Sequence, residues 1–148
     1  PAPSVTGLNT LLLSASNTPV PDIVALAATP TGDGIVNLAS SGAFSVATVN
    51  VGSSGTITAS ADTGEATLPV SITLCETNPA TGACINPPAP TSGPVATSIA
   101  SGATPTFACF VTSTGTVPFD PANNRIFVRF KDALGVTRGS TSVAVRTQ

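Results

Sequence analysis

The sequence predicts an all-β fold, an antiparallel β-sandwich, and three of its features lead to that class. Its 148 residues suffice for one domain with a single two-layer core. Its apolar residues, 41% of the chain, alternate with polar ones in short runs and rarely show helical spacing. Turns rich in Gly and Pro separate these runs at intervals of about ten residues, as in sandwiches.

Each run has the length and alternation of a strand. The run at residues 68–76 shows it best, because Val70, Ile72 and Leu74 fall on one face. The Pro-rich stretch that follows, up to Pro94, is expected to be a loop. The predicted strands are residues 8–15, 22–28, 35–39, 43–51, 55–61, 68–76, 94–100, 106–112, 125–132 and 136–146.

The first run differs from the others because it is apolar on both faces. Leu11, Leu12 and Leu13 follow one another, and Pro19 and Pro21 then form a hinge. The chain is therefore divided into an N-terminal extended segment, residues 1–21, and a sandwich domain, residues 22–148. The segment is either an ordinary first strand or a donor strand that adds to the sheet of a neighbouring copy.

Composition argues against several functional classes. The chain has no His, the commonest general base, so an acid–base pair would need two acids brought together by folding. We expect no enzyme, no cofactor and no metal. A pI of about 4.6 argues against a nucleic-acid partner. There is no run of 18 apolar residues, so no transmembrane segment is expected.

Positive charge is confined to the end of the chain. Residues 1–124 hold six acidic and no basic residues, whereas residues 125–148 hold five basic residues and Asp132. In a strand through NRIFVRFKD, the side chains of Ile126, Val128 and Phe130 would face the core. The side chains expected on the outer face are those of Arg125, Phe127, Arg129 and Lys131, with Arg146 of the partner strand.

This basic stripe has three interpretations that the residues leave open. It is a solvated outer face that discourages sheet-to-sheet pairing, a contact surface between copies, or a site for an acidic polysaccharide or lipid headgroup. Two acidic turns, residues 62–65 and 119–124, could also offer oxygen ligands to calcium, although ordinary surface turns explain both equally well.

The three cysteines predict one disulfide. Cys75 and Cys84 flank ETNPATGA, whose Asn-Pro and Thr-Gly pairs would turn the chain back on itself. A disulfide between them indicates an oxidising compartment. Cys109 lies among apolar residues and is expected to be a buried free thiol; an intersubunit disulfide or a different pairing is the alternative.

The last 30 residues resemble the closing strands of bacterial immunoglobulin-like surface domains. The resemblance rests on PFDPANNRIFVRFKDALGVTRGSTSVAVRT, in which a strand, a D-x-x-G turn, a G-S-T step and a valine-rich strand follow in order. It implies an immunoglobulin-like sandwich of the kind found in adhesins, fimbriae and surface layers. It implies no shared active site, and the Cys…Trp…Cys core of antibody domains is absent, since the chain has no Trp.

The sequence therefore favours a non-enzymatic structural subunit of an extracellular filament or surface layer of bacterial type. Assembly would be head-to-tail, by strand donation and charge complementarity. The expected contacts are Leu11, Leu12 and Leu13 as donors and Arg125, Phe127, Arg129 and Lys131 as the receiving face. The alternative is an adhesin or carbohydrate-binding module of a larger surface protein, which would be monomeric.

Overall fold

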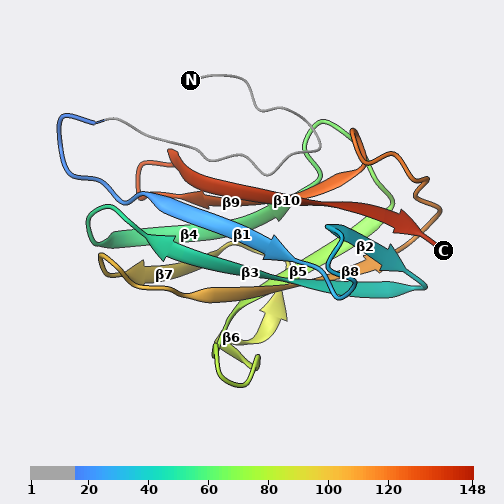
Figure 1. Cartoon of the computed structure of the whole chain (residues 1–148), viewed down its shortest axis with the longest axis horizontal. Helices are drawn as coiled ribbons and strands as arrows, with labels where there is room; N and C mark the ends of the chain where they lie inside the picture. Colours follow the sequence, from blue (N-terminus) through green and yellow to red (C-terminus); the bar gives the residue numbers. More distant parts are fainter. Residues whose placement is uncertain (1–15) are drawn as a thin grey trace.

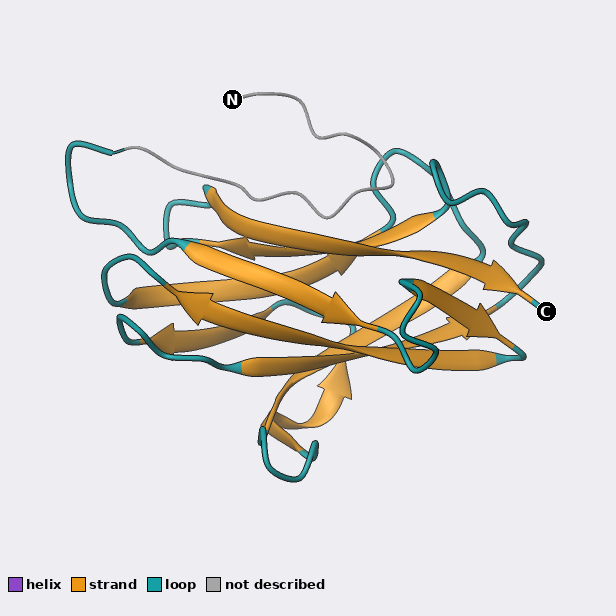
Figure 2. Cartoon of the chain, viewed as in Figure 1, coloured by secondary structure: helices purple, strands orange, loops and turns teal. Residues whose placement is uncertain are grey.

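Two five-stranded sheets pack face to face in a computed structural model, which describes residues 16–148 (Figures 1 and 2). The first sheet has the strand order β1-β3-β8-β5-β6, and the second has β2-β10-β9-β4-β7. The described residues contain no helix. The predicted all-β sandwich is confirmed, whereas the predicted strand at residues 8–15 lies outside the described part.

The strands fall close to their predicted positions, with one addition. Their bounds are β1 Ile23–Ala28, β2 Ile35–Leu38, β3 Ser41–Asn50, β4 Gly55–Asp62, β5 Val70–Thr77, β6 Cys84–Thr91, β7 Val95–Ile99, β8 Thr106–Ser113, β9 Arg125–Lys131 and β10 Thr137–Thr147. In β9 the predicted core residues Ile126, Val128 and Phe130 are completely buried. Alternation of side chains along the strand thus decides which residues form the core.

One strand pair is parallel, which departs from the wholly antiparallel sandwich that the sequence predicts. β1 pairs antiparallel with β3, and after a turn the chain crosses to the other sheet, where β2 runs parallel to β10 from Ile35 opposite Ala144. The carboxylate of Asp33 holds this turn, because its Oδ1 accepts hydrogen bonds from the Ile35 N–H and the Thr31 hydroxyl. The first and second strands of the domain therefore belong to different sheets.

The Pro-rich stretch expected to be a loop contains a strand, β6. It carries Pro87, Pro88 and Pro90 and lies at the edge of the first sheet, paired only with β5. Proline has no backbone N–H, so it cannot donate to a neighbouring strand. A central strand has neighbours on both sides, whereas an edge strand has one side free and tolerates proline there. The prediction was wrong because composition alone does not distinguish an edge strand from a loop.

The predicted disulfide is present and joins the two strands of this edge hairpin. Cys75 of β5 is completely buried, and Cys84 begins β6, with the two Cα atoms 5.6 Å apart. The β5–β6 register is irregular and prolines weaken its ladder. The covalent bond therefore holds β6 where hydrogen bonds are few.

We expect the Cys75→Ser/Cys84→Ser variant to lose about 2–3 kcal/mol of unfolding free energy. The reason is that a disulfide closing a loop of this length lowers the conformational entropy of the unfolded chain, which raises its free energy by that amount. Urea denaturation followed by circular dichroism measures it. The Cys84→Ser single variant under reducing conditions is the control. It shows how much of the loss comes from replacing a cysteine side chain by serine and how much comes from breaking the bond. Unchanged stability of the double variant would mean that the bond does not hold the hairpin.

The two outer faces of the sandwich differ in charge. β1, β3 and β8 of the first sheet contain no charged residue, and exposed Leu26 and Phe110 lie among Ser, Thr and Ala there. All five basic residues lie on β9 and β10 of the second sheet. The outer face of the second sheet is therefore where charged chemistry concentrates.

Candidate functional site

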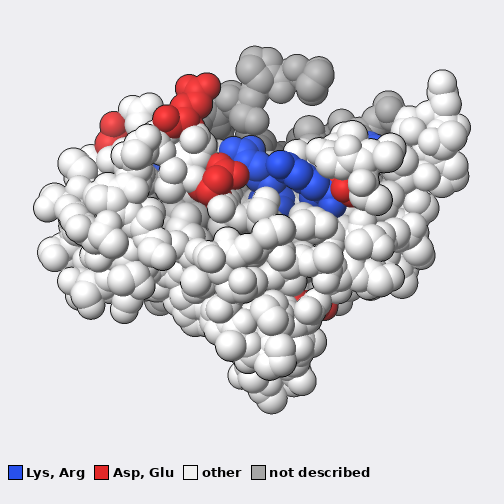
Figure 3. All heavy atoms as spheres, turned by 180° about the vertical axis from the view of Figure 1, so that it is seen from behind, with Lys and Arg blue, Asp and Glu red and all other residues white. Residues whose placement is uncertain are grey.

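The basic residues gather in one patch, with acidic residues at its margin (Figure 3). We define the basic face as the outer side of the second sheet around five residues: Phe119, Phe127, Arg129, Lys131 and Arg146. β9 supplies three of them at alternate positions, because successive side chains of a strand point to opposite sides of the sheet. β10 contributes Arg146, and the loop before β9 contributes Phe119.

Arg129 is fixed at the centre of the basic face by two neighbours. Its Nε lies 2.7 Å from Oδ2 of Asp62 and its Nη2 lies 3.2 Å from Oδ1, a bidentate ion pair with β4. Its guanidinium carbon also lies 4.8 Å from the centroid of the Phe127 ring. About a third of the Arg129 side chain, 32%, stays exposed, so it is held in place and can still meet a partner.

A second cation–aromatic pair lies at the end of the same face. The guanidinium carbon of Arg146 is 4.9 Å from the Phe119 ring centroid, and its Nε donates a 2.6 Å hydrogen bond to Oδ1 of Asn37 on β2. Phe119 is 54% exposed, which is unusual for a large aromatic side chain. The expectation that Arg146 faces outward is confirmed.

Arg125 does not belong to the exposed stripe, contrary to the prediction. Only 6% of it is exposed. Its Nε donates to the Ser142 hydroxyl and its Nη2 to the Ser142 carbonyl, while its Nη1 donates to the carbonyl of Pro121. The loop between β8 and β9 covers the guanidinium, and this long-range contact is not visible in the strand pattern.

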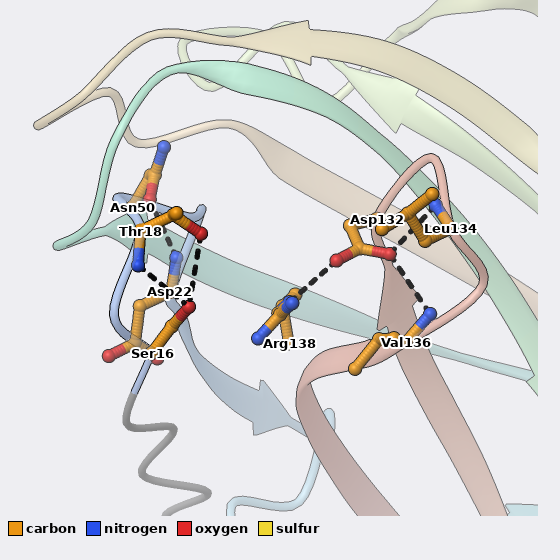
Figure 4. A network of polar contacts seen from close by, with 8 residues as sticks. All are labelled: Ser16, Thr18, Asp22, Asn50, Asp132, Leu134, Val136 and Arg138. Atoms are coloured by element: carbon orange, nitrogen blue, oxygen red, sulfur yellow. Dashed lines mark hydrogen bonds and ion pairs between the residues drawn. The ribbon is translucent and has the colours of Figure 1, made fainter.

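The separation of charge along the sequence is partly lost in space. Besides Asp62 with Arg129, Asp132 pairs with Arg138 at 2.7 Å, and both side chains of that pair are about nine-tenths buried (Figure 4). The same figure shows the Asp22 N–H bonded to Oδ1 of Asn50 on β3. Among the described residues, Arg125, Lys131 and Arg146 form no ion pair, so the positive charge of the face is smaller than the sequence suggests.

The paired carboxyls have lowered pKa values. For Asp62, burial raises the pKa, but hydrogen bonds from Arg129 and the Gly64 N–H and the positive charge of Arg129 outweigh it, so the pKa lies below its usual range. Asp132 behaves in the same way, with burial opposed by Arg138 and the N–H groups of Val136 and Leu134. Both carboxylates are therefore stabilised as anions by the fold.

This lowering predicts how stability depends on pH. Because the folded pKa of Asp62 is below the unfolded one, its contribution is complete above about pH 5 and is lost as the pH falls through about 4 towards the folded pKa. With no His in the chain, the free energy of unfolding is expected to be nearly flat between about pH 5 and 8. Urea denaturation from pH 2.5 to 8 measures the free energy of unfolding. The Asp62→Asn variant should lose less of that free energy at acid pH than the parent chain does. A stability that rises on acidification would contradict this assignment.

Two hollows indent the surface beside the basic face. A groove of about 480 Å³ runs between the β4–β5 loop and the β8–β9 loop, with Phe127, Arg129 and Glu65 among its lining residues. A cavity of about 390 Å³ lies on the other side of the β8–β9 loop, where Arg125 and Phe119 line it. Both hollows thus combine an aromatic ring with a guanidinium.

Cys109 is a free thiol that faces the core of the sandwich, as expected. It is completely buried, and this burial raises its pKa to about 12. It therefore contributes stability below the ordinary thiol pKa of about 8.5, and that contribution is lost as the pH rises above it. Burial and a raised pKa both make the Cys109 thiol a poor nucleophile at neutral pH.

We expect the Cys109 thiol to resist Ellman's reagent in the native protein and to react within minutes in concentrated urea. The reason is that the thiolate, which is the reactive species, is both rare and inaccessible in the folded state. Absorbance of the released chromophore measures the reaction, with Cys109→Ser as the blank. Rapid labelling of the native chain would contradict the buried position.

The described residues offer little for metals or membranes. In residues 16–148, no group of three His, Cys, Asp or Glu side chains could hold a metal ion. In the acidic turn at 62–65, the Asp62 carboxylate pairs with Arg129 and accepts a hydrogen bond from the Gly64 N–H. In the turn at 119–124, the Asp120 carboxylate accepts a hydrogen bond from the Asn123 side chain. In that same part of the chain, no helix is long and apolar enough to cross a membrane.

Sequence reasoning placed Phe127, Arg129 and Lys131 on one face, and the structure brings them together there. It considered Asp62 and Phe119 only as parts of the two acidic turns and did not place them on this face. The pairing of Asp62 depends on β4 lying opposite β9, a register that a strand pattern does not specify. Phe119 was considered only as the first residue of the acidic turn at 119–124, and its contact with Arg146 joins that turn to β10. Leu11, Leu12 and Leu13 lie outside the described residues.

Comparisons with known proteins give a weak likeness of fold. No family model matches the chain, and no curated protein does. Among solved structures, AvmM, which catalyses macrocyclization in alchivemycin A biosynthesis, aligns at a TM-score of 0.47 with 13% identity, over 85% of this chain and 88% of that one. The N-terminal domain of PorA aligns at 0.44 with 7% identity, over 84% and 98%. At such TM-scores neither protein carries information on the function of this chain.

Proposed function

We propose that this chain is a non-enzymatic structural subunit of an extracellular filament or surface layer, and that the basic face is its contact surface. The observation that carries the proposal is the difference between the two outer faces. Strands β1, β3 and β8 of one sheet contain no charged residue, whereas every basic residue of the chain lies on β9 and β10 of the other, and three of them, Arg129, Lys131 and Arg146, belong to the basic face. A mainly basic face, with aromatic rings held under its guanidinium groups, suits recognition of an acidic surface.

The disulfide supports an extracellular location. Bonds such as Cys75–Cys84 persist in oxidising compartments and are rare in the cytosol. The scarcity of charge, 8% of residues, and the resemblance of residues 118–147 to bacterial immunoglobulin-like surface domains support the same location.

In the proposed assembly, the basic face of one copy meets acidic loops of the next. Glu65 of the β4–β5 loop and Asp120 of the β8–β9 loop are acidic residues that form no ion pair among the described residues. Glu65 lines the groove beside Phe127 and Arg129, so copies must be offset for the loop of one to meet the face of the next. Such an offset contact is head-to-tail, and it propagates when it does not close into a ring. Residues 8–15, with Leu11, Leu12 and Leu13, would add a donor strand to the neighbouring sheet.

Negative-stain microscopy and light scattering of the full chain test this proposal beside a chain lacking residues 1–20. Filaments or sheets from the full chain and monomers from the shortened one are expected if strand donation links the copies. Circular dichroism is the control that checks whether the shortened chain is folded. Folded monomers from both chains at high concentration would refute the proposal. In that case a monomeric binding module, the alternative, would be favoured.

A further inference from the structure

The cavity around Arg125 contains a buried charge that forms no ion pair with a described carboxylate. Arg125 is 6% exposed, and none of the described acidic residues lies within ion-pair distance of it. Arginine is rarely this buried without a paired anion, because removing its charge from water is costly. Its neighbours, two carbonyl groups and one hydroxyl, are all neutral.

The guanidinium still has donors to offer. Arginine carries five N–H groups, and Arg125 uses three of them in hydrogen bonds, which leaves one on each terminal nitrogen. A planar fork with a donor on each terminal nitrogen matches the two oxygens of a carboxylate. Because Ser142 and Pro121 already hold the side chain, little entropy is lost when it binds an anion.

The other walls of the cavity suit the rest of a sugar. Phe119, 54% exposed, offers an aromatic surface for the apolar side of a ring. Asp33 also lines the cavity, and its hydrogen bonds from residues 29, 31 and 35 all go to Oδ1, so Oδ2 remains an acceptor for hydroxyl groups. The volume of about 390 Å³ lies within the range of small-molecule sites, about 300–1,000 Å³.

We propose that this cavity binds a uronic acid residue, with its carboxylate on Arg125, its ring against Phe119 and its hydroxyl groups on Asp33. The negative charge of Asp33 disfavours a compact dianion such as phosphate, whereas a sugar presents neutral hydroxyls to it. Two of its three residues, Arg125 and Asp33, lie outside the basic face, and only Phe119 is shared with the proposed contact surface. Binding through Arg125 can therefore be measured on the dilute, unassembled chain.

Titration of the dilute full chain with sodium galacturonate, followed by amide NMR shifts, tests the site. Saturable shifts are expected at residues 33–35, 119–125 and 142–144, with a Kd of about 1 mM, the affinity that a ligand of this size reaches at ordinary efficiency. Galactose, which lacks the carboxylate, should bind at least about tenfold more weakly. Equal binding of both sugars, or shifts elsewhere, would overturn the proposal.

Two variants and one control define the contacts. Phe119→Ala should weaken binding about fivefold, while Phe110→Ala, an equally simple truncation on the first sheet, should leave it unchanged. Arg125→Lys keeps the charge but not the fork, and about a tenfold loss is expected. If that variant does not fold, Phe119→Ala decides alone. Inorganic phosphate binding as tightly as galacturonate would reduce the cavity to a plain anion site and overturn the sugar assignment.

Assembly and binding give separate outcomes. A chain that binds galacturonate and stays monomeric contradicts the structural-subunit proposal and supports this inference. A chain that forms filaments and shows no saturable shifts does the reverse.

Discussion

Phe130→Ala is expected to lower the free energy of unfolding by about 3–5 kcal/mol, the cost typical of removing a large aromatic side chain from a core. Phe130 of β9 is completely buried, and its ring meets that of Phe107 on β8 edge to face, with centroids 5.3 Å apart and planes at 60°. This contact crosses from one sheet to the other. Its loss would leave a cavity where the two layers meet.

Urea denaturation followed by circular dichroism measures this loss, since the chain has no Trp and no Tyr for a fluorescence signal. Phe110→Ala is the matched control. Phe110 lies on the same strand as Phe107, β8, but its side chain points to the outer face and is 38% exposed. It should cost less than about 1 kcal/mol. Equal losses for the two variants would mean that the sheets are not joined through Phe130.

Gly139→Val is expected to destabilise the fold by about 3 kcal/mol or more, at the upper end of what overpacking costs. A Cβ atom on Gly139 of β10 would lie 2.1 Å from the carbonyl oxygen of Ile23 and 2.9 Å from its carbonyl carbon. Both are backbone atoms, so a side-chain rotation cannot relieve the clash. β1 would have to move away from β10.

Thermal unfolding of Gly139→Val and of Gly139→Ala measures the effect, with Gly93→Ala as the control. A Cβ on Gly93 would meet only the Thr91 hydroxyl, at an ordinary 3.6 Å, so stability should change by less than about 1 kcal/mol. Parental stability of Gly139→Ala would show that β1 and β10 do not approach as closely as described.

Local pattern predicted what depends on local sequence. The alternation in β9 identified Ile126, Val128 and Phe130 as core residues, because the period of a strand is fixed by the backbone alone. The short, turn-rich stretch between Cys75 and Cys84 was enough to predict their disulfide.

What the sequence did not reveal depends on distant segments meeting. Arg125 looked exposed because its strand phase is outward, yet Pro121 and Ser142 cover it. The pairing of Arg129 with Asp62 joins residues 67 positions apart, and it depends on β4 lying beside β9. The edge strand β6 was missed because proline excludes only a central strand, which is hydrogen-bonded to a neighbouring strand on each side. An edge strand has one side free of partners and tolerates proline there.

Sedimentation velocity of two charge-reversed variants, alone and mixed, tests the contact most directly. Lys131→Glu alters the basic face and Glu65→Lys alters the proposed acidic loop. We predict that the parent chain assembles at low salt, that each variant alone sediments as a monomer, and that an equimolar mixture assembles again, since the reversed charges then face each other. If all three samples sediment as the parent does, the basic face is not the surface through which copies meet.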